Sequence, residues 1–294
     1  MFFLKERKIK KQAKADEAKT PTIKMSQERI LQQRLNPESF LPTIFNSQPK
    51  QGLRFLSIHK PDSAAQILEG QHIFKIRTAA TLDRAHAASV LIQNMYAWRG
   101  YDTTQAAAVG IKASGEEWRR KKNEVTLIAA EGDKTFATLT VRYDSPEGLA
   151  CDELYRDELN QFRAQGSKFC EFTRLAMDRA PDSKEVFASL MHIGYIYAYD
   201  LNKCTDVVIE VNPRHVSFYK KMLGMTQLGS EKICPRVNAP AVLLHVPFSF
   251  VQHQIAQFGG LREKAKQEKS FYPYFFNEWD EADVVARLLK ATTV

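Results

Sequence analysis

The feature that most constrains the fold is a strand–helix–strand run between Phe169 and Val211. Phe169 to Met177 and Asp206 to Val211 are short apolar segments with the composition of β-strands, and the second is apolar enough to be central in a sheet. Between them, Ser183 to about Tyr199 carries apolar residues at three- and four-residue spacing, which is typical of a helix. This run predicts a sheet covered by helices.

The same patterns recur elsewhere along the chain. The other expected strands are 72–79, 125–130, 135–143 and 237–246, with a hairpin joining the second of these to the third. The other expected helices are 81–98, capped by Thr81, 152–165, ended by Gly166, and 212–224. The order of these elements predicts an α/β (α+β) domain whose mixed sheet is flanked by helices.

Two end segments differ from this central part. Residues 1–70 are rich in Lys and Gln and are interrupted by prolines, so we expect a basic, disordered leader, either a solvated tail or an electrostatic arm for an anionic surface such as lipid. We place the folded domain at 71–250. Residues 251–294 combine a polar helix, an aromatic cluster and a last helix from 280 to 290, and we expect this C-terminal extension to pack on the core or on a partner.

Composition narrows the class of protein. The net charge is +8, but ten basic and four acidic residues fall before residue 35, so the rest of the chain carries only +2. A nearly neutral body argues against a nucleic-acid-binding protein. No apolar run is long enough to span a bilayer and no signal peptide is evident, which predicts a cytoplasmic protein with possible peripheral membrane contact only through the leader. Neither the four cysteines nor the histidines show metal-ligand spacing, so we expect reduced thiols and no metal.

One strand carries charges that an apolar strand does not need. Glu171 and Arg174 are three residues apart, and period-two geometry puts Glu171 and Thr173 on one face and Arg174 on the other, unless a bulge re-aims one of them. The strand is either half exposed, with its charges reaching water, or it holds a carboxylate in a cleft. In a cleft, burial raises the carboxyl pKa and prepares the group for proton transfer.

The sequence around these residues resembles a known superfamily. The run from Val211 to Met225, with Asn212, a helix bearing Phe218-Tyr219, and Leu223-Gly224, looks like the last βα unit of the GNAT acyltransferases. More narrowly, Glu171 to Asp178, the Asn212 to His215 start and the later segment Cys234 to Pro240 together resemble the long-chain N-acyl amino acid synthases. These enzymes are akin to acyl-homoserine lactone synthases, and the resemblance covers roughly His72 to Pro247. It implies a GNAT-like fold.

The resemblance also implies roles at the reaction centre. Members of the family move a fatty acyl group from acyl carrier protein to the amine of an amino acid, tyrosine in the best-known case. Glu171 would be the base that deprotonates the amine, directly or through water. Arg174 would anchor a carboxylate or order the acidic residues, unless it only forms a structural ion pair, and Tyr219 would protonate the leaving thiolate, unless it is a core residue.

The donor side departs from ordinary GNAT enzymes. Their Gly-rich loop cradles the coenzyme A pyrophosphate, whereas Asp178 to Lys184 contains no glycine and two aspartates. This favours acyl-phosphopantetheine on acyl carrier protein as the donor, with no tightly bound cofactor. The residues expected to contact the donor are Leu175, Ala176, Met177, Arg179, Lys184, Asn212 and Arg214. The basic ones among them, with Lys220 and Lys221, would dock the acidic carrier protein, unless they are ordinary solvated surface.

The acceptor-binding residues are predicted from the expected helix 81–98 and from the loop that contains Arg236 and Asn238. Gln93 stands where the lactone synthases have an arginine, which favours a plain amino acid over S-adenosylmethionine. The residues expected to contact the acceptor are Tyr96, Trp98, Tyr101, Arg236 and Asn238, although the aromatic ones also suit a core and the loop also suits a scaffold. The leading hypothesis is therefore an N-acyltransferase. A coenzyme A-dependent N-acetyltransferase and a non-catalytic nucleic-acid-binding protein are the alternatives.

Overall fold

The fold is described from a computed structural model. It describes residues 54–55, 65–69, 72–101, 123–178 and 183–292. The chain separates into two units, Met1–Asn46 and Ser47–Val294, and the first lies wholly outside these residues. All that follows concerns the second unit.

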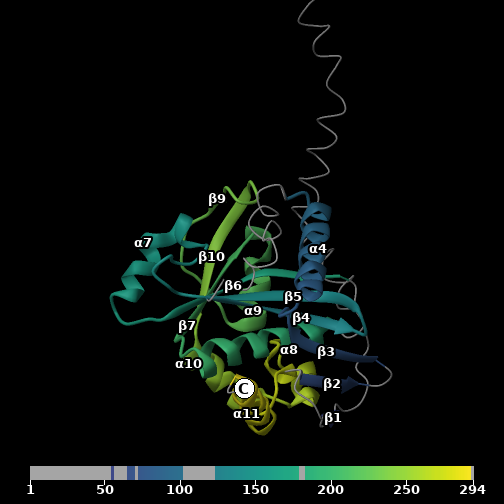
Figure 1. The fold of residues 1–294 in the computed structure, drawn as a ribbon. Coiled ribbons are helices and arrows are strands. Elements are labelled where there is room, and N and C mark those ends of the chain that lie inside the picture. The colour runs from purple at the N-terminus through teal and green to yellow at the C-terminus, as the bar shows by residue number, and fades with distance from the viewer. Residues whose placement is uncertain (1–53, 56–64, 70–71, 102–122, 179–182, 293–294) are drawn as a thin grey trace, which may run out of the picture. The chain divides into compact units, whose positions relative to one another are not determined.

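Ten strands of the described residues form one sheet system, in the order β1-β2-β3-β4-β5-β6-β7-β10-β8, with β9 paired to β10 (Figure 1). The strands are β1 Arg54–Phe55, β2 Ala65–Glu69, β3 His72–Thr78, β4 Glu124–Glu131, β5 Lys134–Tyr143, β6 Phe169–Met177, β7 Asp206–Val211, β8 Thr226–Gln227, β9 Lys232–Cys234 and β10 Ala239–Pro247. The β6–β7 pair is parallel and the other pairs are antiparallel. The sheet is therefore mixed, as predicted.

Helices alternate with these strands and cover them. They are α4 Leu82–Trp98, α7 Asp152–Arg163, α8 Ser183–Tyr195, the π-helix η2 Ile196–Leu201, the 3₁₀ helix η3 Pro213–His215, α9 Val216–Leu223, α10 Phe248–Phe258, the 3₁₀ helices η4 Arg262–Lys266 and η5 Tyr272–Tyr274, and α11 Glu278–Thr292. Thr81 caps α4 as expected, its hydroxyl accepting a hydrogen bond from the amide of Arg84 at 3.4 Å. Strands β6 and β7 have the bounds expected from the sequence.

The two faces of the sheet are covered by different helices. α4 and α8 lie on opposite sides of β4 and β5 (Figure 1). α8 packs so closely that a Cβ on Gly194 would lie 2.9 Å from the ring of Phe172 and 3.1 Å from Leu139, which requires glycine at that crossing. On the other face, α7 buries Tyr155 and Leu159 against Phe169 of β6 and Val208 of β7. Because alternate residues share a face, Glu171 lies on this α7 side of the sheet.

The sheet extends further toward the N-terminus than the sequence indicated. We expected residues 1–70 to be a disordered leader, but β2 pairs antiparallel with β3 from Ala65↔Ile76 to Glu69↔His72, and β1 pairs with β2. The folded unit thus includes residues 54–55 and 65–69 of that segment. The rest of the expected leader lies outside the described residues.

The C-terminal segment packs on α8, as predicted. Phe271 lies 4.7 Å from Phe187 between ring centroids, and the rings of Phe275 and Phe276 stack on His192. Trp279 is the exception in this aromatic cluster, because 86% of its surface is exposed on α11. Trp279 lies away from the core because Val284 and Leu288 form the buried side of its helix.

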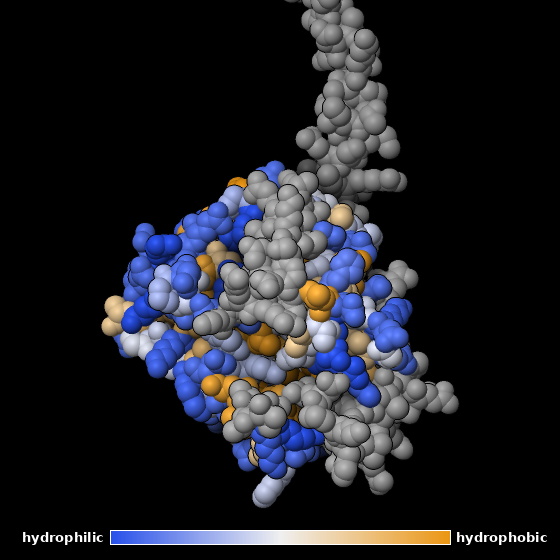
Figure 2. Space-filling model, viewed as in Figure 1, coloured by the Kyte–Doolittle hydropathy of each residue, from blue (hydrophilic) through white to orange (hydrophobic). Residues whose placement is uncertain are grey.

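The surface of the described residues carries isolated apolar side chains. The face seen in Figure 2 is largely hydrophilic, with separate hydrophobic spots. Within the described ranges, no helix combines the length and the apolar composition needed to cross a bilayer.

Candidate active site

The site begins where β6 separates from its parallel neighbour. β6 pairs with β7 only from Phe169↔Asp206 to Glu171↔Val208, although β6 itself continues to Met177. On its other edge the register to β5 shifts between Thr138 and Thr140, which marks a β-bulge in β6. Glu171 is therefore the last residue of β6 that pairs with β7, at the point where the two strands separate, which we call the fork.

The bulge changes the direction of Arg174. This residue has a φ of 52°, and a non-glycine residue in that region costs on the order of 1–3 kcal/mol. Simple alternation placed Arg174 on the face opposite Glu171. In the structure its Nη1 donates to Glu124 Oε1 at 3.1 Å, and Glu124 lies on the Glu171 side, because Glu124 pairs with Arg142 and Arg142 pairs with Glu171 across the sheet. The bulge thus brings both charges of the E-x-x-R motif to one face.

Glu171 is almost completely buried, with 1% of its surface exposed. Its Oε2 accepts hydrogen bonds from the backbone N–H groups of Ala150 at 2.7 Å and of Cys151 at 3.4 Å, in the loop that leads into α7. Among the described residues, no hydrogen bond reaches Oε1. Burial raises the pKa of the Glu171 carboxyl, against the opposing effect of Arg142, and nearby Glu210 raises it further.

Two arginines compensate the carboxylates around Glu171. Arg142 donates to Glu124 Oε2 through Nη2 at 3.0 Å and Nε at 3.3 Å. Arg236 donates to Glu210 Oε1 at 2.7 Å and to the carbonyl of Ala150 at 2.9 Å, and it also pairs with Glu153. Arg236, predicted on the acceptor side, is thereby fixed beside the loop that binds Glu171. Asn238, predicted with it, is exposed in the turn after β9 with a φ of 45°.

A second group of side chains joins the end of α4 to the start of α9. Tyr96 and Tyr101 form an edge-to-face pair with ring centroids 5.8 Å apart. Burial raises the pKa of Tyr96 to about 12 and that of Tyr219 further, and Tyr96, Tyr101 and Arg99 all lie close enough to Tyr219 to influence its titration. Arg174, which belongs to the Glu171 network, also lies close enough to Tyr96 to influence its pKa, in the lowering direction. Tyr96 therefore lies between this group and the Glu171 network.

The remaining predicted residues differ in their exposure and in their distance along the chain from Glu171. Ala176 is buried, Leu175 and Met177 are half-buried at the end of β6, and Lys184 is half-buried in the first turn of α8. Asn212 caps η3, its side-chain oxygen accepting from the amide of Arg214 at 3.3 Å. Arg179 lies outside the described residues. Trp98 is 68% exposed at the end of α4, and its ring centre lies 5.9 Å from the guanidinium carbon of Arg99.

Sequence reasoning missed three residues of the network and one of the second group. Arg142 and Glu210 lie close enough to Glu171 to influence its pKa, Glu124 pairs with Arg142, and Arg99 lies among the tyrosines. The hairpin offered a signal for two of them, because the β4–β5 register sets Glu124 directly opposite Arg142, the arrangement of a cross-strand ion pair. No comparable signal marked Glu210, whose partner Arg236 comes from a distant turn.

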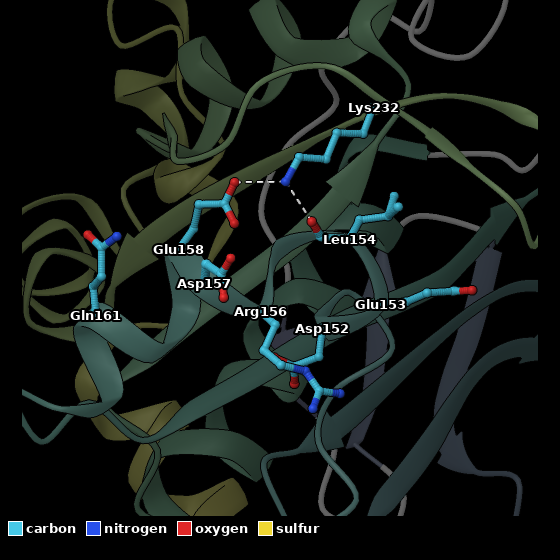
Figure 3. A pocket seen from close by; sticks show the side chains of 8 residues that line it. All are labelled: Asp152, Glu153, Leu154, Arg156, Asp157, Glu158, Gln161 and Lys232. Carbon is cyan, nitrogen blue, oxygen red and sulfur yellow. Dashed lines mark hydrogen bonds and ion pairs between the residues drawn. The ribbon is translucent and has the colours of Figure 1, made fainter.

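A separate hollow of about 700 Å³ lies over α7 and is lined by α7 side chains and Lys232 of β9. Figure 3 shows Lys232 reaching Glu158 and the carbonyl of Leu154, at 2.9 and 2.6 Å. None of the predicted site residues lines it. Its open, largely acidic lining does not suit a fatty acyl chain.

The arrangement at the fork can perform proton transfer next to an acyl group. Glu171 offers one oxygen held by backbone N–H groups and a second that accepts no hydrogen bond from the described residues, in a setting that disfavours its charge. A buried carboxylate of raised pKa is a suitable general base near neutral pH. Tyr219, whose pKa burial raises, stays protonated at neutral pH and can donate a hydrogen bond.

Comparisons with known proteins identify the family of this chain. The family model for N-acyl amino acid synthase FeeM matches residues 87–247, more than half of the chain. The solved structure of FeeM, an N-acyl amino acid synthase from uncultured soil microbes, is 26% identical with a TM-score of 0.50, and the alignment covers 59% of this chain and 95% of that one. None of the curated proteins compared with the chain matches it.

Two further solved structures align less closely. A putative acetyltransferase of the GNAT family from Desulfovibrio desulfuricans is 11% identical with a TM-score of 0.41, covering 59% of this chain and 98% of that one. The coenzyme A-dependent acyl-homoserine lactone synthase BjaI is 14% identical with a TM-score of 0.39, covering 56% and 74%. The predicted mixed sheet flanked by helices is the fold of this chain. The chain belongs to the N-acyl amino acid synthase family of FeeM and is an acyltransferase.

Proposed function

We propose that this enzyme moves a long-chain fatty acyl group from acyl carrier protein to the α-amine of an amino acid, with Glu171 as the general base. The observation that carries the proposal is the position of Glu171, buried at the fork of β6 and β7 with one carboxylate oxygen that no described residue hydrogen-bonds. Membership of the N-acyl amino acid synthase family supports the reaction type.

The reaction needs the nitrogen of the acceptor to lose two protons and the leaving sulfur to gain one. The α-ammonium loses its first proton to Glu171, directly or through water, and the neutral nitrogen then attacks the thioester carbonyl carbon. The N–C bond forms, the C–S bond breaks, and the leaving thiolate takes a proton from Tyr219. The nitrogen gives up its second proton, which returns through water to the Tyr219 phenolate, and Glu171 releases the first proton to solvent. Backbone N–H groups near Leu175 to Met177, beyond the end of the β6–β7 pairing, would stabilise the negative charge on the carbonyl oxygen.

The donor is inferred from the segment between β6 and α8. Asp178 to Lys184 contains no glycine and two aspartates, which is unfavourable for a pyrophosphate and favours a donor with one distant phosphate. Acyl carrier proteins are acidic, and Lys220 and Lys221 are exposed on α9. These features support acyl-phosphopantetheine on its carrier protein as donor substrate, with no tightly bound cofactor.

The acceptor is inferred from the aromatic residues beside Tyr219. Tyr96 and Tyr101 supply two rings next to the expected position of the amine, which suits an amino acid with an aromatic side chain such as tyrosine.

The test compares donors and acceptors with the purified full-length chain. Palmitoyl acyl carrier protein, palmitoyl-coenzyme A and acetyl-coenzyme A are each supplied with the standard amino acids, and products are identified by mass spectrometry. We expect an N-palmitoyl amino acid, a higher kcat/KM with the carrier protein, and a preference that falls with salt because docking is electrostatic. Equal kcat/KM for the two donors would refute the donor assignment. Transfer only from acetyl-coenzyme A would identify the enzyme as an N-acetyltransferase instead.

A further inference from the structure

The exposed side of α11 carries a stripe of apolar residues. Trp279 and Leu289 are 86% and 51% exposed, and Ala282 and Ala286, which lie between them in the sequence, are exposed as well. Steps of three, four and three residues keep these four side chains on one side of a helix. The core packs against the opposite side of α11, which buries Val284. The helix therefore has a second apolar face, which we call the α11 stripe.

The order of residues in the α11 stripe is symmetric about its centre. When two copies of α11 lie antiparallel with a two-fold axis level with Val284, Trp279 lies opposite Leu289 of the second copy, and Ala282 lies opposite Ala286. The small central residues let the two backbones approach closely, and the large end residues cover the contact. The same spacing, with apolar residues at alternating steps of three and four, forms the seam of a coiled coil. The stripe is thus complementary to a second copy of itself.

The charge distribution of α11 favours the antiparallel arrangement. Its first turn carries Glu278, Asp280 and Glu281, and its last turn carries Lys290. Antiparallel copies bring each Lys290 level with the acidic first turn of the other helix, whereas parallel copies bring like charges together. The two helix dipoles also oppose each other in the antiparallel pair, which is the favourable orientation.

We infer that the α11 stripe is the contact surface of a homodimer in which two copies of α11 pair antiparallel. Such a contact is isologous, because the same surface serves both subunits and closes the assembly at two. The inference goes beyond the proposed function and does not depend on it. α11 begins at Glu278, beyond the end of the family match at residue 247, so the surface belongs to the C-terminal segment and not to the matched domain.

Other occupants suit the α11 stripe less well. Helices that lie on membranes combine several large apolar residues with a basic polar face. Here two of the four stripe residues are alanines, and the first turn is acidic. The acidic first turn also opposes docking of an acidic protein such as acyl carrier protein. A second copy of α11 is the partner that matches both the shape and the charge of the stripe.

The test is sedimentation equilibrium of the purified full-length chain. One 15-residue helix from each subunit is a small contact beside the ~1,200–2,000 Å² of stable interfaces, so we expect a Kd of about 10–100 µM. The mean mass should rise with concentration from 33.6 kDa toward twice that value. Ala282→Arg places an unpaired charge at the centre of the contact and should raise Kd by at least about tenfold. Ala256→Arg, at an exposed alanine of α10, is the matched control and should leave Kd unchanged.

Lys290→Gln tests the orientation of the two helices. In the antiparallel pair it removes an attraction to the acidic first turn of the other copy, so Kd should rise by about two- to tenfold at low salt. In a parallel pair it would remove repulsion between two lysines, and Kd would fall. A lower Kd in Lys290→Gln would therefore contradict the antiparallel arrangement.

Three further results would overturn the inference. A mass of 33.6 kDa at every concentration up to several times the expected Kd would show that the chain does not dimerise. An equal Kd in Ala282→Arg and in the wild type would place the dimer contact on another surface. A monomeric chain that binds vesicles of phosphatidylcholine and phosphatidylglycerol, and loses that binding in Ala282→Arg, would assign the stripe to a membrane. If Ala282→Arg does not fold, Trp279→Gln is judged by the same Kd criterion, because its side chain lies outside the core.

Discussion

Glu171 and His192 are both buried titratable residues, and their surroundings differ in one decisive respect. His192 is 0% exposed in α8, where its Nδ1 accepts from the amide of Phe276 at 2.9 Å and its Nε2 lies 2.8 Å from Glu281. Both ring nitrogens are therefore engaged. Glu171 is 1% exposed, but the hydrogen bonds from described residues reach only its Oε2.

The contrast separates a structural role from a chemical one. A buried polar group whose every atom is satisfied holds elements together, and here His192 ties the C-terminal segment to α8. A buried carboxylate with an unused oxygen and a raised pKa can exchange a proton with a ligand. Substitution at the two sites should therefore affect different quantities.

The largest expected effect is on turnover in Glu171→Gln. Glutamine keeps the size and the bonds from Ala150 and Cys151 but cannot take a proton from the amine. We expect the rate at pH 7 to fall by roughly 10²- to 10⁴-fold with little change in melting temperature. The measurement is the steady-state rate of amide formation beside a thermal melt.

Glu158→Gln is the matched control, because Glu158 is a carboxylate on α7 that pairs with Lys232 outside the site. It should change turnover by less than about twofold. Near-normal turnover in Glu171→Gln, or a large loss of stability with intact turnover, would make Glu171 a structural residue like His192.

The next largest effect is on stability in His192→Leu. The substitution leaves the Phe276 amide without its acceptor and Glu281 without its partner, so we expect a loss of about 2–3 kcal/mol in the free energy of unfolding. Turnover per folded molecule should stay within about twofold. Urea unfolding gives the first quantity and the assay well below the melting temperature gives the second. A severe loss of turnover in a fully folded variant would show that His192 is not only structural and would contradict the distinction between the two sites.

A smaller effect is expected for Gly194→Ala, which probes the helix that connects the two sites. The added Cβ would lie 2.9 Å from Phe172, the neighbour of Glu171 in β6. Overpacking of this kind costs about 1–3 kcal/mol, which urea unfolding would detect. Unchanged stability would show that β6 and α8 separate easily, contrary to the close packing described above.

The smallest effect is a pH dependence of stability. Burial lowers the pKa of His192 below 6.5, against the opposing effect of Glu281, so the unfolded chain binds its proton more readily than the folded one. The contribution of His192 to the free energy of unfolding is complete above pH 6.5, and it is lost as the pH falls from 6.5 through the pKa of His192 in the folded protein. Melting temperatures at about pH 7.5 and about pH 5.5 should therefore differ less in His192→Leu than in the wild type. An equal difference in both proteins would show that His192 does not contribute.

The sequence predicted most of the fold because local patterns specify it. Strands β6 and β7 and helix α4 follow from apolar spacing and from the Thr81 cap, and the hairpin follows from Gly132 at its turn. Short strands such as β8 and β9 were missed, because two or three residues carry no period and are defined by their partner β10. The two-residue β1 was missed for the same reason, and the five-residue β2 was missed because it falls in the segment that composition predicted to be disordered.

The candidate site was only half predictable. Glu171 stood out as a carboxylate in an apolar strand, but the direction of Arg174 depends on a bulge that arises from pairing with β5. Arg99, which follows α4, and His215 of η3 meet only because two segments far apart in the sequence approach each other in three dimensions. A pattern along the sequence does not show which distant segments come into contact in the folded protein.

The most direct test of Glu171 as the base is the pH dependence of kcat/KM in the wild type and in Glu171→Gln. A base must be ionised, and burial raises the pKa of Glu171, so activity should fall on the acid side as pH decreases through a pKa above the ordinary value for glutamate. In Glu171→Gln this acid limb should disappear, leaving a low rate that rises with pH as more of the amine becomes neutral. The same acid limb, with the same midpoint, in both proteins would contradict the assignment of Glu171 as the base.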